Sequence, residues 1–341
     1  MIGNNLKKEF SSIRIVLLLL PLILSFVITN SFYRDILILV MLWSAAASAW
    51  NLLGGYAGQL SIGHAAFFGI GAYTSTLIFI HFSISPWIGM LVGGLVASII
   101  GVILGSLTFP LKGPFFSLST IAFAEIIRIL AIGWSDLTKG SAGIVIPYKT
   151  SFSNMIFENQ QTVSIIIWLA MIGMYLVSIY FSNSKLGYYL MAYRENEDAA
   201  RALGINTLVV RLKAVAVSAF LTALLGSFFA QYVLYIDPES LFIVDNSLQM
   251  VLLSLVGGVG TTIGPIIGGY IMIPLGQLLR AFFGGIAPGL HLVIYGLCLV
   301  LILLYLPKGL VSLFKKPISF SPLKWFRRTT PKETVSLNKG D

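Results

Sequence analysis

The residues of this chain that could do chemistry are few, and most of them interrupt long apolar segments. Glu125 and Arg128 stand three residues apart within the apolar run 115–134. Residues at this spacing are neighbours on one face of a helix, so the two side chains can form an ion pair. Ionisable residues inside an apolar span are functional candidates, because an isolated charge in hydrocarbon is costly. A structural ion pair that holds a helix contact is the alternative, and the sequence favours it.

A second polar group lies in the segment 54–73, which is rich in glycine, alanine and serine. Gln59, Ser61 and His64 bring polar side chains into this segment. Small residues let helices approach closely, and helices that break within a membrane often line the path of a solute. We therefore take these three residues as candidates for lining such a path, with tight helix packing as the alternative. A similar glycine-rich break occurs at 257–269.

The segment 184–213 carries charged residues of both signs between two apolar runs. Its pattern predicts a short helix from Tyr188 to Gly204, because glycine commonly ends a helix. Acid–base pairs four residues apart stabilise helices, and the segment contains two, Glu197 with Arg201 and Arg194 with Asp198. Small residues between these charges would let another protein surface approach closely; they include Ala199 and Ala200. Any exposed helix in a loop needs similar residues, so docking of a partner is one of two interpretations.

No arrangement typical of catalysis or of metal binding is recognisable. No nucleophile stands beside a base, the three histidines have no companion ligands at metal spacing, and Cys298 is the only cysteine. We therefore expect no enzyme, no metal site and no cofactor on this chain. The phosphate-binding loop G-x-x-x-x-G-K-[ST] is also missing from the sequence. If ATP drives a process in which this protein takes part, a separate chain must hydrolyse it.

The elements that position these residues must be membrane spans. The chain has 341 residues, of which 57% are hydrophobic and 10% charged, and its mean hydropathy is +0.90. Soluble domains carry roughly 25% charged residues, and a helix needs about 20 apolar residues to cross the hydrocarbon core. The apolar runs are continuous, so we predict an all-α polytopic bundle of about ten transmembrane helices (eight to ten) and no β-barrel. The predicted spans are 13–32, 36–54, 65–80, 87–110, 115–134, 162–181, 213–235, 247–263, 264–282 and 289–306.

The distribution of Lys and Arg orients this bundle. Ten spans place both termini on one side, and the positive-inside rule assigns that side to the cytoplasm. The only basic residues that then fall in outside segments are Arg34, Lys139, Lys149 and Arg280. This placement accounts for the net charge of +9, so we expect a lipid bilayer and no nucleic acid as partner. The predicted division is a cytoplasmic N-terminus at 1–12, a transmembrane domain at 13–310 with the cytoplasmic loop 184–213, and a basic cytoplasmic tail at 311–341.

Several of these segments resemble a known family. Asp198-Ala199-Ala200-x3-Gly204 is similar to the Glu-Ala-Ala-x3-Gly loop of ABC importer permeases, with Asp in place of Glu. The resemblance extends from about residue 36 to 310 and is to LivM-type permease subunits of branched-chain amino acid ABC importers. The matching stretches are WNLLGGYAGQLSIGHAAFFGIGAY at 50–73, AFAEIIR at 122–128, YRENEDAA at 193–200 and GGVGTTIGP at 257–265.

The resemblance implies a multi-pass permease in the bacterial cytoplasmic (inner) membrane. It implies that an extracytoplasmic solute-binding protein delivers leucine, isoleucine or valine. It further implies cytoplasmic P-loop ATPase subunits and a second, homologous permease of the LivH type as partners. The residues it assigns to the helix that couples to the ATPase are Arg194, Glu197, Asp198, Ala199, Ala200 and Gly204.

Two other functions stay open at this point. Related permeases handle urea or short amides, so a urea or short-amide ABC permease is the first alternative. The second is a secondary transporter driven by an ion gradient, which would need unpaired ionisable residues near the middle of the membrane. Only Glu125 qualifies, and Arg128 would neutralise it.

Overall fold

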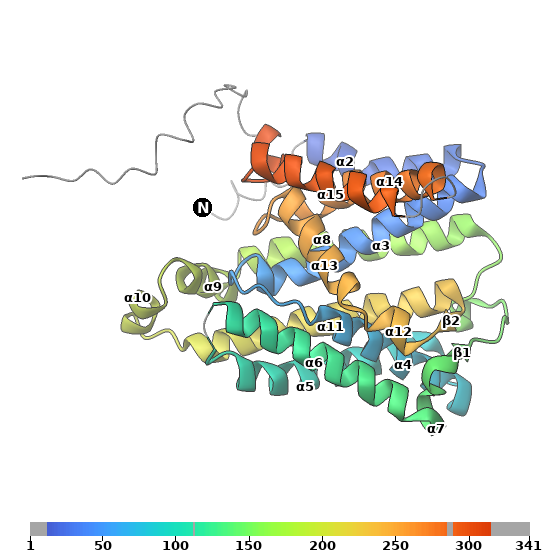
Figure 1. Cartoon of the computed structure of the whole chain (residues 1–341), viewed down its shortest axis with the longest axis horizontal. Helices are drawn as coiled ribbons and strands as arrows, with labels where there is room; N and C mark the ends of the chain where they lie inside the picture. Colours follow the sequence, from blue (N-terminus) through green and yellow to red (C-terminus); the bar gives the residue numbers. More distant parts are fainter. Residues whose placement is uncertain (1–11, 112, 285–288, 315–341) are drawn as a thin grey trace, which may run out of the picture.

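A computed structural model of the chain describes residues 12–111, 113–284 and 289–314. Almost all of the ordered elements are helices, which run roughly parallel to one axis of the molecule (Figure 1). The helices are α2 (Ser12–Val27), α3 (Ser31–Gly54), α4 (His64–Phe82), α5 (Pro86–Thr108), α6 (Pro114–Gly133), α7 (Ser135–Thr138), α8 (Gln160–Ser182), α9 (Lys185–Glu195), α10 (Glu197–Ala202), α11 (Thr207–Val233), α12 (Pro238–Leu241), α13 (Val244–Gly257), α14 (Gly264–Phe283) and α15 (Leu290–Tyr305). The short elements are the 3-10 helices η1 (Gly140–Ala142), η2 (Phe152–Asn154) and η3 (Leu310–Phe314) and the strands β1 (Ile144–Val145) and β2 (Tyr235–Ile236).

Eight helical segments of the described chain are long and apolar enough to cross a membrane. They contain α3, α4, α5, α6, α8, α11, α13 and α14, and all of them overlap predicted spans. The first and last predicted spans correspond to the shorter apolar helices α2 and α15. The all-α polytopic fold is therefore confirmed. The count of ten spans and the cytoplasmic termini stay predictions, and the N-terminal segment and most of the tail at 311–341 lie outside the described residues.

Local sequence signals explain where several helices begin. Short polar side chains satisfy the free N–H groups of a first turn, and proline fits there because it has no N–H to satisfy. Asn30 accepts a hydrogen bond from the backbone of Phe32 and begins α3. Asn206 does the same for α11 through the backbone of Val209. Proline stands in the first turn of α5, α6 and α14.

The core lies around α3, α4 and α11. The apolar window of α3 is 94% buried, and α3 packs against α8, α11, α13 and α14. α4 and α11 are in close contact because glycines face the opposing backbone. A Cβ atom on Gly71 would collide with the carbonyl of Ala223, and one on Gly226 with the carbonyl of Phe68. This close pairing holds in place the loop that precedes α4.

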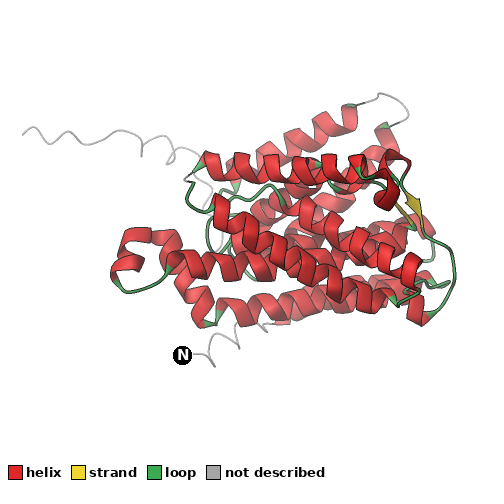
Figure 2. Ribbon diagram, turned by 90° about the horizontal axis from the view of Figure 1, so that it is seen from below, coloured by secondary structure: helices red, strands yellow, loops and turns green. Residues whose placement is uncertain are grey.

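The two ends of the bundle differ (Figures 1 and 2). At one end, α9 and α10 protrude beyond the long helices, and we call this the inner end. At the opposite, outer end, β1 pairs with β2 in antiparallel register, Ile144 with Ile236 and Val145 with Tyr235. This pairing joins the loop between α7 and α8 to the segment that follows α11.

Candidate functional site

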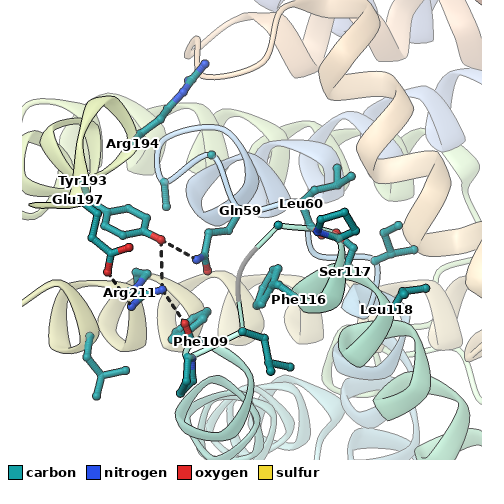
Figure 3. Close-up of a pocket in the computed structure, with 18 of the residues that line it drawn as sticks. Gln59, Leu60, Phe109, Phe116, Ser117, Leu118, Tyr193, Arg194, Glu197 and Arg211 are labelled. Carbon is teal, nitrogen blue, oxygen red and sulfur yellow. Dashed lines mark hydrogen bonds and ion pairs between the residues drawn. The ribbon is translucent and has the colours of Figure 1, made fainter.

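A pocket of about 960 Å³ opens at the inner end of the bundle (Figure 3). Its walls come from the loop 55–63, the turn between α5 and α6, the first turns of α6, the α9–α10 segment and the beginning of α11. The wall is apolar toward α6 and polar toward α9 and α11. Six of the lining side chains form the polar wall and the aromatic surface beside it: Gln59, Phe109, Phe116, Tyr193, Glu197 and Arg211.

Arg211 is the centre of the polar wall. It lies in the second turn of α11, where only 4% of the residue is exposed. Its guanidinium donates hydrogen bonds to the carbonyls of Thr207 (3.1 Å) and Phe109 (3.0 Å) and to the hydroxyl of Tyr193 (3.1 Å). The same group lies 5.0 Å from the ring centroid of Phe109 and 4.7 Å from that of Tyr193, at cation–π distance. Arg211 thus ties together α11, α9 and the turn that follows α5.

This network reaches both the helix α10 and the loop 55–63 (Figure 3). Glu197 is the first residue of α10, and its Oε1 atom lies 2.5 Å from Nη2 of Arg201 and 3.7 Å from Nη2 of Arg211. On the other side, the Gln59 amide donates to the Tyr193 hydroxyl over 3.0 Å. α10 is therefore in direct contact with the residues of the pocket wall, through Glu197 and Arg211.

The predicted single helix from Tyr188 to Gly204 is wrong, because the structure has two helices. Asn196 ends α9 and caps α10, with its side chain accepting a hydrogen bond from the backbone of Ala199. Its extended backbone (φ −159°, ψ 111°) breaks the helical path between them. A polar cap inside a charged segment competes with helix continuation, which the pattern of charges alone does not reveal.

The break also separates Arg194 from Asp198, so the second predicted ion pair is absent from the described structure. Arg194 instead donates to the carbonyl of Gly55 over 2.7 Å and fixes the beginning of the loop 55–63. The predicted pair of Glu197 and Arg201 is present. The predicted stop at Gly204 is also present, because this residue takes the left-handed conformation (φ +80°) that glycine adopts without strain.

The side of α10 that faces away from the bundle is exposed. Asp198, Ala199 and Ala202 are exposed, and 80% of Leu203 is accessible at the tip. Ala200 is buried (2% exposed) and faces the bundle. The segment therefore presents a small apolar and acidic surface beyond the ends of the long helices, joined at its back to Arg211.

Of the three polar residues predicted to line a path, only Gln59 reaches the inner pocket. Ser61 and His64 belong to a packed network. The hydroxyl of Ser61 lies 3.1 Å from His64 Nδ1, and His64 Nε2 lies 2.8 Å from the hydroxyl of Ser218, which donates to the carbonyl of Ala49. The indole of Trp50 donates to the carbonyl of Ser61. These contacts anchor the end of the loop 55–63 and the first residue of α4 to α3 and α11, as the packing alternative expects.

Glu125 and Arg128 form the expected ion pair, with Nε to Oε2 at 2.9 Å and Nη2 to Oε1 at 2.5 Å. They lie past the midpoint of the 20-residue helix α6. The buried side of α6 is formed by Phe116, Thr120 and Ala124. Arg128 follows Ala124 by one turn and is 28% exposed, whereas Glu125 lies on the other side of the helix and is 41% exposed. The structure does not bring the pair to the inner pocket. Its functional role stays a prediction.

The sequence reasoning missed Arg211, Tyr193 and Phe109 as site residues. Arg211 was assigned to the loop before a span that begins at 213. A usable signal was present, since Asn206 is a strong helix cap and places Arg211 inside the first turns of α11. Among the described residues, no group of three or more His, Cys, Asp or Glu side chains could hold a metal ion.

These features define a class. The protein is a multi-pass helical membrane protein, with a short protruding helix that is linked to a pocket at the same end of the bundle. The family model for the branched-chain amino acid transport system permease component matches residues 32–303. This chain therefore belongs to that family, and it is a transport subunit, not an enzyme.

Similar proteins agree with this assignment. The chain is 27% identical over 302 residues to the high-affinity branched-chain amino acid transport system permease protein LivM of Escherichia coli (strain K12), covering 82% of this chain and 70% of that protein. It is 23% identical over 339 residues to a probable LivM permease of Methanocaldococcus jannaschii, covering 85% and 96%. It is 24% identical over 298 residues to the permease protein LivH of Escherichia coli (strain K12), covering 79% and 91%. No solved structure matches the chain significantly.

Proposed function

We propose that this chain is the membrane-spanning permease subunit of an ATP-driven ABC importer for leucine, isoleucine and valine, in the bacterial cytoplasmic membrane. The observation that carries the proposal is the direct linkage from α10 to the inner pocket through Glu197 and Arg211. The sequence contains no phosphate-binding loop of its own. If a separate ATPase drives transport, the permease needs a surface that binds the ATPase and also contacts the pocket wall. The protruding helix α10 meets both requirements.

Membership of the family supports a proposal for the partners. We infer cytoplasmic P-loop ATPases that hold the exposed surface of α10, a second homologous permease of the LivH type beside this chain, and a solute-binding protein at the outer end. The substrate assignment is supported by relatives that are named as branched-chain amino acid permeases. No cofactor is proposed for this chain.

The geometry gives this coupling a mechanism. Closure of the ATPases on ATP would displace α10, and Glu197 would carry that displacement to Arg211. Arg211 holds the backbone of Phe109 and the hydroxyl of Tyr193, and Tyr193 holds Gln59. The turn after α5 and the loop 55–63 would therefore move together. Because both form walls of the inner pocket, their joint movement would open or close it.

An ion-gradient mechanism has less support. It needs an ionisable group that is free to exchange protons or ions within the membrane. Glu125 is held by two hydrogen bonds from Arg128, and His64 is engaged through both ring nitrogens.

The test is co-purification. The chain is tagged, native membranes are solubilised in a mild detergent, and the captured proteins are identified by mass spectrometry. A P-loop ATPase and a second permease are expected in stoichiometric amounts, and capture of this chain alone would count against the proposal. A solute-binding protein recovered with them is titrated with leucine and with urea, and binding of urea in preference to leucine would assign the other substrate class.

A further inference from the structure

A second cavity, of about 400 Å³, lies near the outer end between α13, α14 and α15. Its volume falls within the range of about 300–1,000 Å³ that is usual for small-molecule sites. The residues that define its chemistry are Asp245, Gln249, Gln277, Arg280, His291 and Tyr295. It is remote from the inner pocket, with which it shares no lining residue.

The lining is arranged in layers, because α13 and α14 pack against each other and the chain turns back between them over residues 258–263. Asp245 lies in the first turn of α13 and Arg280 in the last turn of α14, so both are at the outer mouth. Gln249 follows Asp245 by four residues and Gln277 precedes Arg280 by three, which places one amide about a turn below each charge. The deepest layer is apolar and contains Leu252, Met272 and Ile273.

The polar side chains of this cavity have no partners within the described chain. No hydrogen bond or ion pair of the described residues engages the side chains of Asp245, Gln249, Gln277 or Arg280. In addition, His291 Nδ1 is buried without a hydrogen-bond partner. Gln249 and Gln277 are half-buried, whereas Asp245 and Arg280 are exposed at the mouth of the cavity. Buried polar groups are normally paired, so the half-buried amides and the imidazole nitrogen of His291 are open to water or a ligand, and the two charged side chains are free to reach a ligand that enters the mouth.

We propose that this cavity is an outer binding site for a zwitterionic amino acid with an aliphatic side chain. The Asp245 carboxylate accepts hydrogen bonds from the ligand's ammonium group, and the Arg280 guanidinium donates to its carboxylate. Gln249 and Gln277 supply further amide contacts one turn below. The aliphatic side chain lies against Leu252, Met272 and Ile273. The inference rests on the proposed function, and it assigns the site that receives substrate at the outer end.

A test of occupancy uses cysteine protection in the purified complex. Cys298 is the only cysteine of the chain, so Gln249→Cys in a Cys298→Ser background gives a single thiol in the cavity. The complex is held in nanodiscs that lack phosphatidylethanolamine, without binding protein, and the rate of maleimide labelling of this chain is measured by mass. Leucine is expected to slow labelling in a saturable way, whereas urea leaves the rate unchanged.

Charge variants then test the assigned contacts. Arg280→Gln and Asp245→Asn are each expected to raise the leucine concentration that gives half protection by about tenfold or more, since each loses a charge-assisted hydrogen bond. Lys149→Gln and Asp136→Asn are the matched controls, because they remove the same charges from exposed positions of the outer segments. Both controls are expected to retain the parent value. Recovery of the partner subunits with each variant verifies its folding.

Three results would overturn the proposal. The first is unchanged labelling in saturating leucine, and the second is equal protection in the charge variants and the controls. The third is protection by added phosphatidylethanolamine but not by leucine, since that headgroup also combines an ammonium with an anion and would then be the occupant. ATP-driven leucine uptake by the parent complex separates the two hypotheses. Uptake without protection refutes this site alone, whereas absence of uptake refutes the proposed function as well.

Discussion

Arg211→Lys tests whether the network behind α10 carries coupling. Lysine keeps the positive charge but lacks the planar guanidinium, with its several donors and its stacking surface. A loss of coupling in this variant would therefore result from the changed geometry of the contacts and not from a change of charge. We expect the variant to assemble with its ATPase, because the exposed surface of α10 is unchanged, and to transport less substrate per ATP hydrolysed.

The free energy that Arg211→Lys removes from the network can be estimated from the contacts of Arg211. It donates three hydrogen bonds and lies between two aromatic rings, and a lysine ammonium can replace at most one of these hydrogen bonds from a single point. A hydrogen bond to a charged group contributes about 1.5–3 kcal/mol. Taking the lower value for each of two lost bonds gives about 3 kcal/mol, or a factor of ~100 in the equilibrium between the linked and unlinked arrangements. The ion pair with Glu197 is left out of this sum, because Glu197 is 24% exposed and keeps Arg201 as a partner.

The assay measures ATP hydrolysis and leucine uptake in the same proteoliposomes. Lys213→Arg is the control, because it exchanges the two cation types at an exposed position two residues further along. The ratio of leucine transported to ATP hydrolysed is expected to fall severalfold or more in Arg211→Lys and to stay unchanged in Lys213→Arg. An unchanged ratio in Arg211→Lys, with normal assembly, would refute the role of this network.

Three further predictions concern other parts of the molecule. Leu203→Asp places a charge on the exposed tip of α10, so the ATPase should be lost on co-purification while the thermal stability of the chain is retained. Glu125→Leu leaves Arg128 unpaired within a span, which is unfavourable, so the amount inserted in membranes should fall, and Arg128→Leu in the same chain should restore it. Gly226→Val forces a side chain into the backbone at Phe68, so the melting temperature of the purified protein in detergent should fall by several degrees.

Each of these predictions has an opposite result that would contradict its reasoning. Retention of the ATPase by Leu203→Asp would mean that the contact lies elsewhere on the inner end. Equal insertion of the single and double α6 variants would mean that Arg128 reaches water or another partner. An unchanged melting temperature for Gly226→Val would mean that α4 and α11 separate at little cost.

The fold followed from the sequence to a large extent. Hydropathy is a strong signal for spans of about 20 residues, and every predicted span overlaps an apolar helix of the structure. The break at Asn196 was missed because the charge spacing on both sides favours a helix, whereas the cap that divides it depends on one side-chain hydrogen bond. The sequence motif around Asp198 predicts a helix that couples to the ATPase, and most of its residues form the short helix α10; the coupling role stays a prediction.

The site was predictable only in part. Contacts such as Arg211 with Phe109 join residues that are 102 positions apart, and His64 with Ser218 are 154 apart. Periodicity and local spacing carry no information about such pairs. The layered lining of the outer cavity shows the same limit, because its two halves come from opposite ends of two antiparallel helices and become one site only in the folded protein.

ATP-driven uptake of leucine is the most direct test of the function proposed here. The purified complex is reconstituted in proteoliposomes with its solute-binding protein, ATP is supplied on the side of the ATPase, and no ion gradient is imposed. Leucine should cross the membrane only when ATP is hydrolysed, and an uncoupler should have no effect. Uptake that requires an ion gradient and continues without ATP, or transport of urea with none of leucine, would contradict the account.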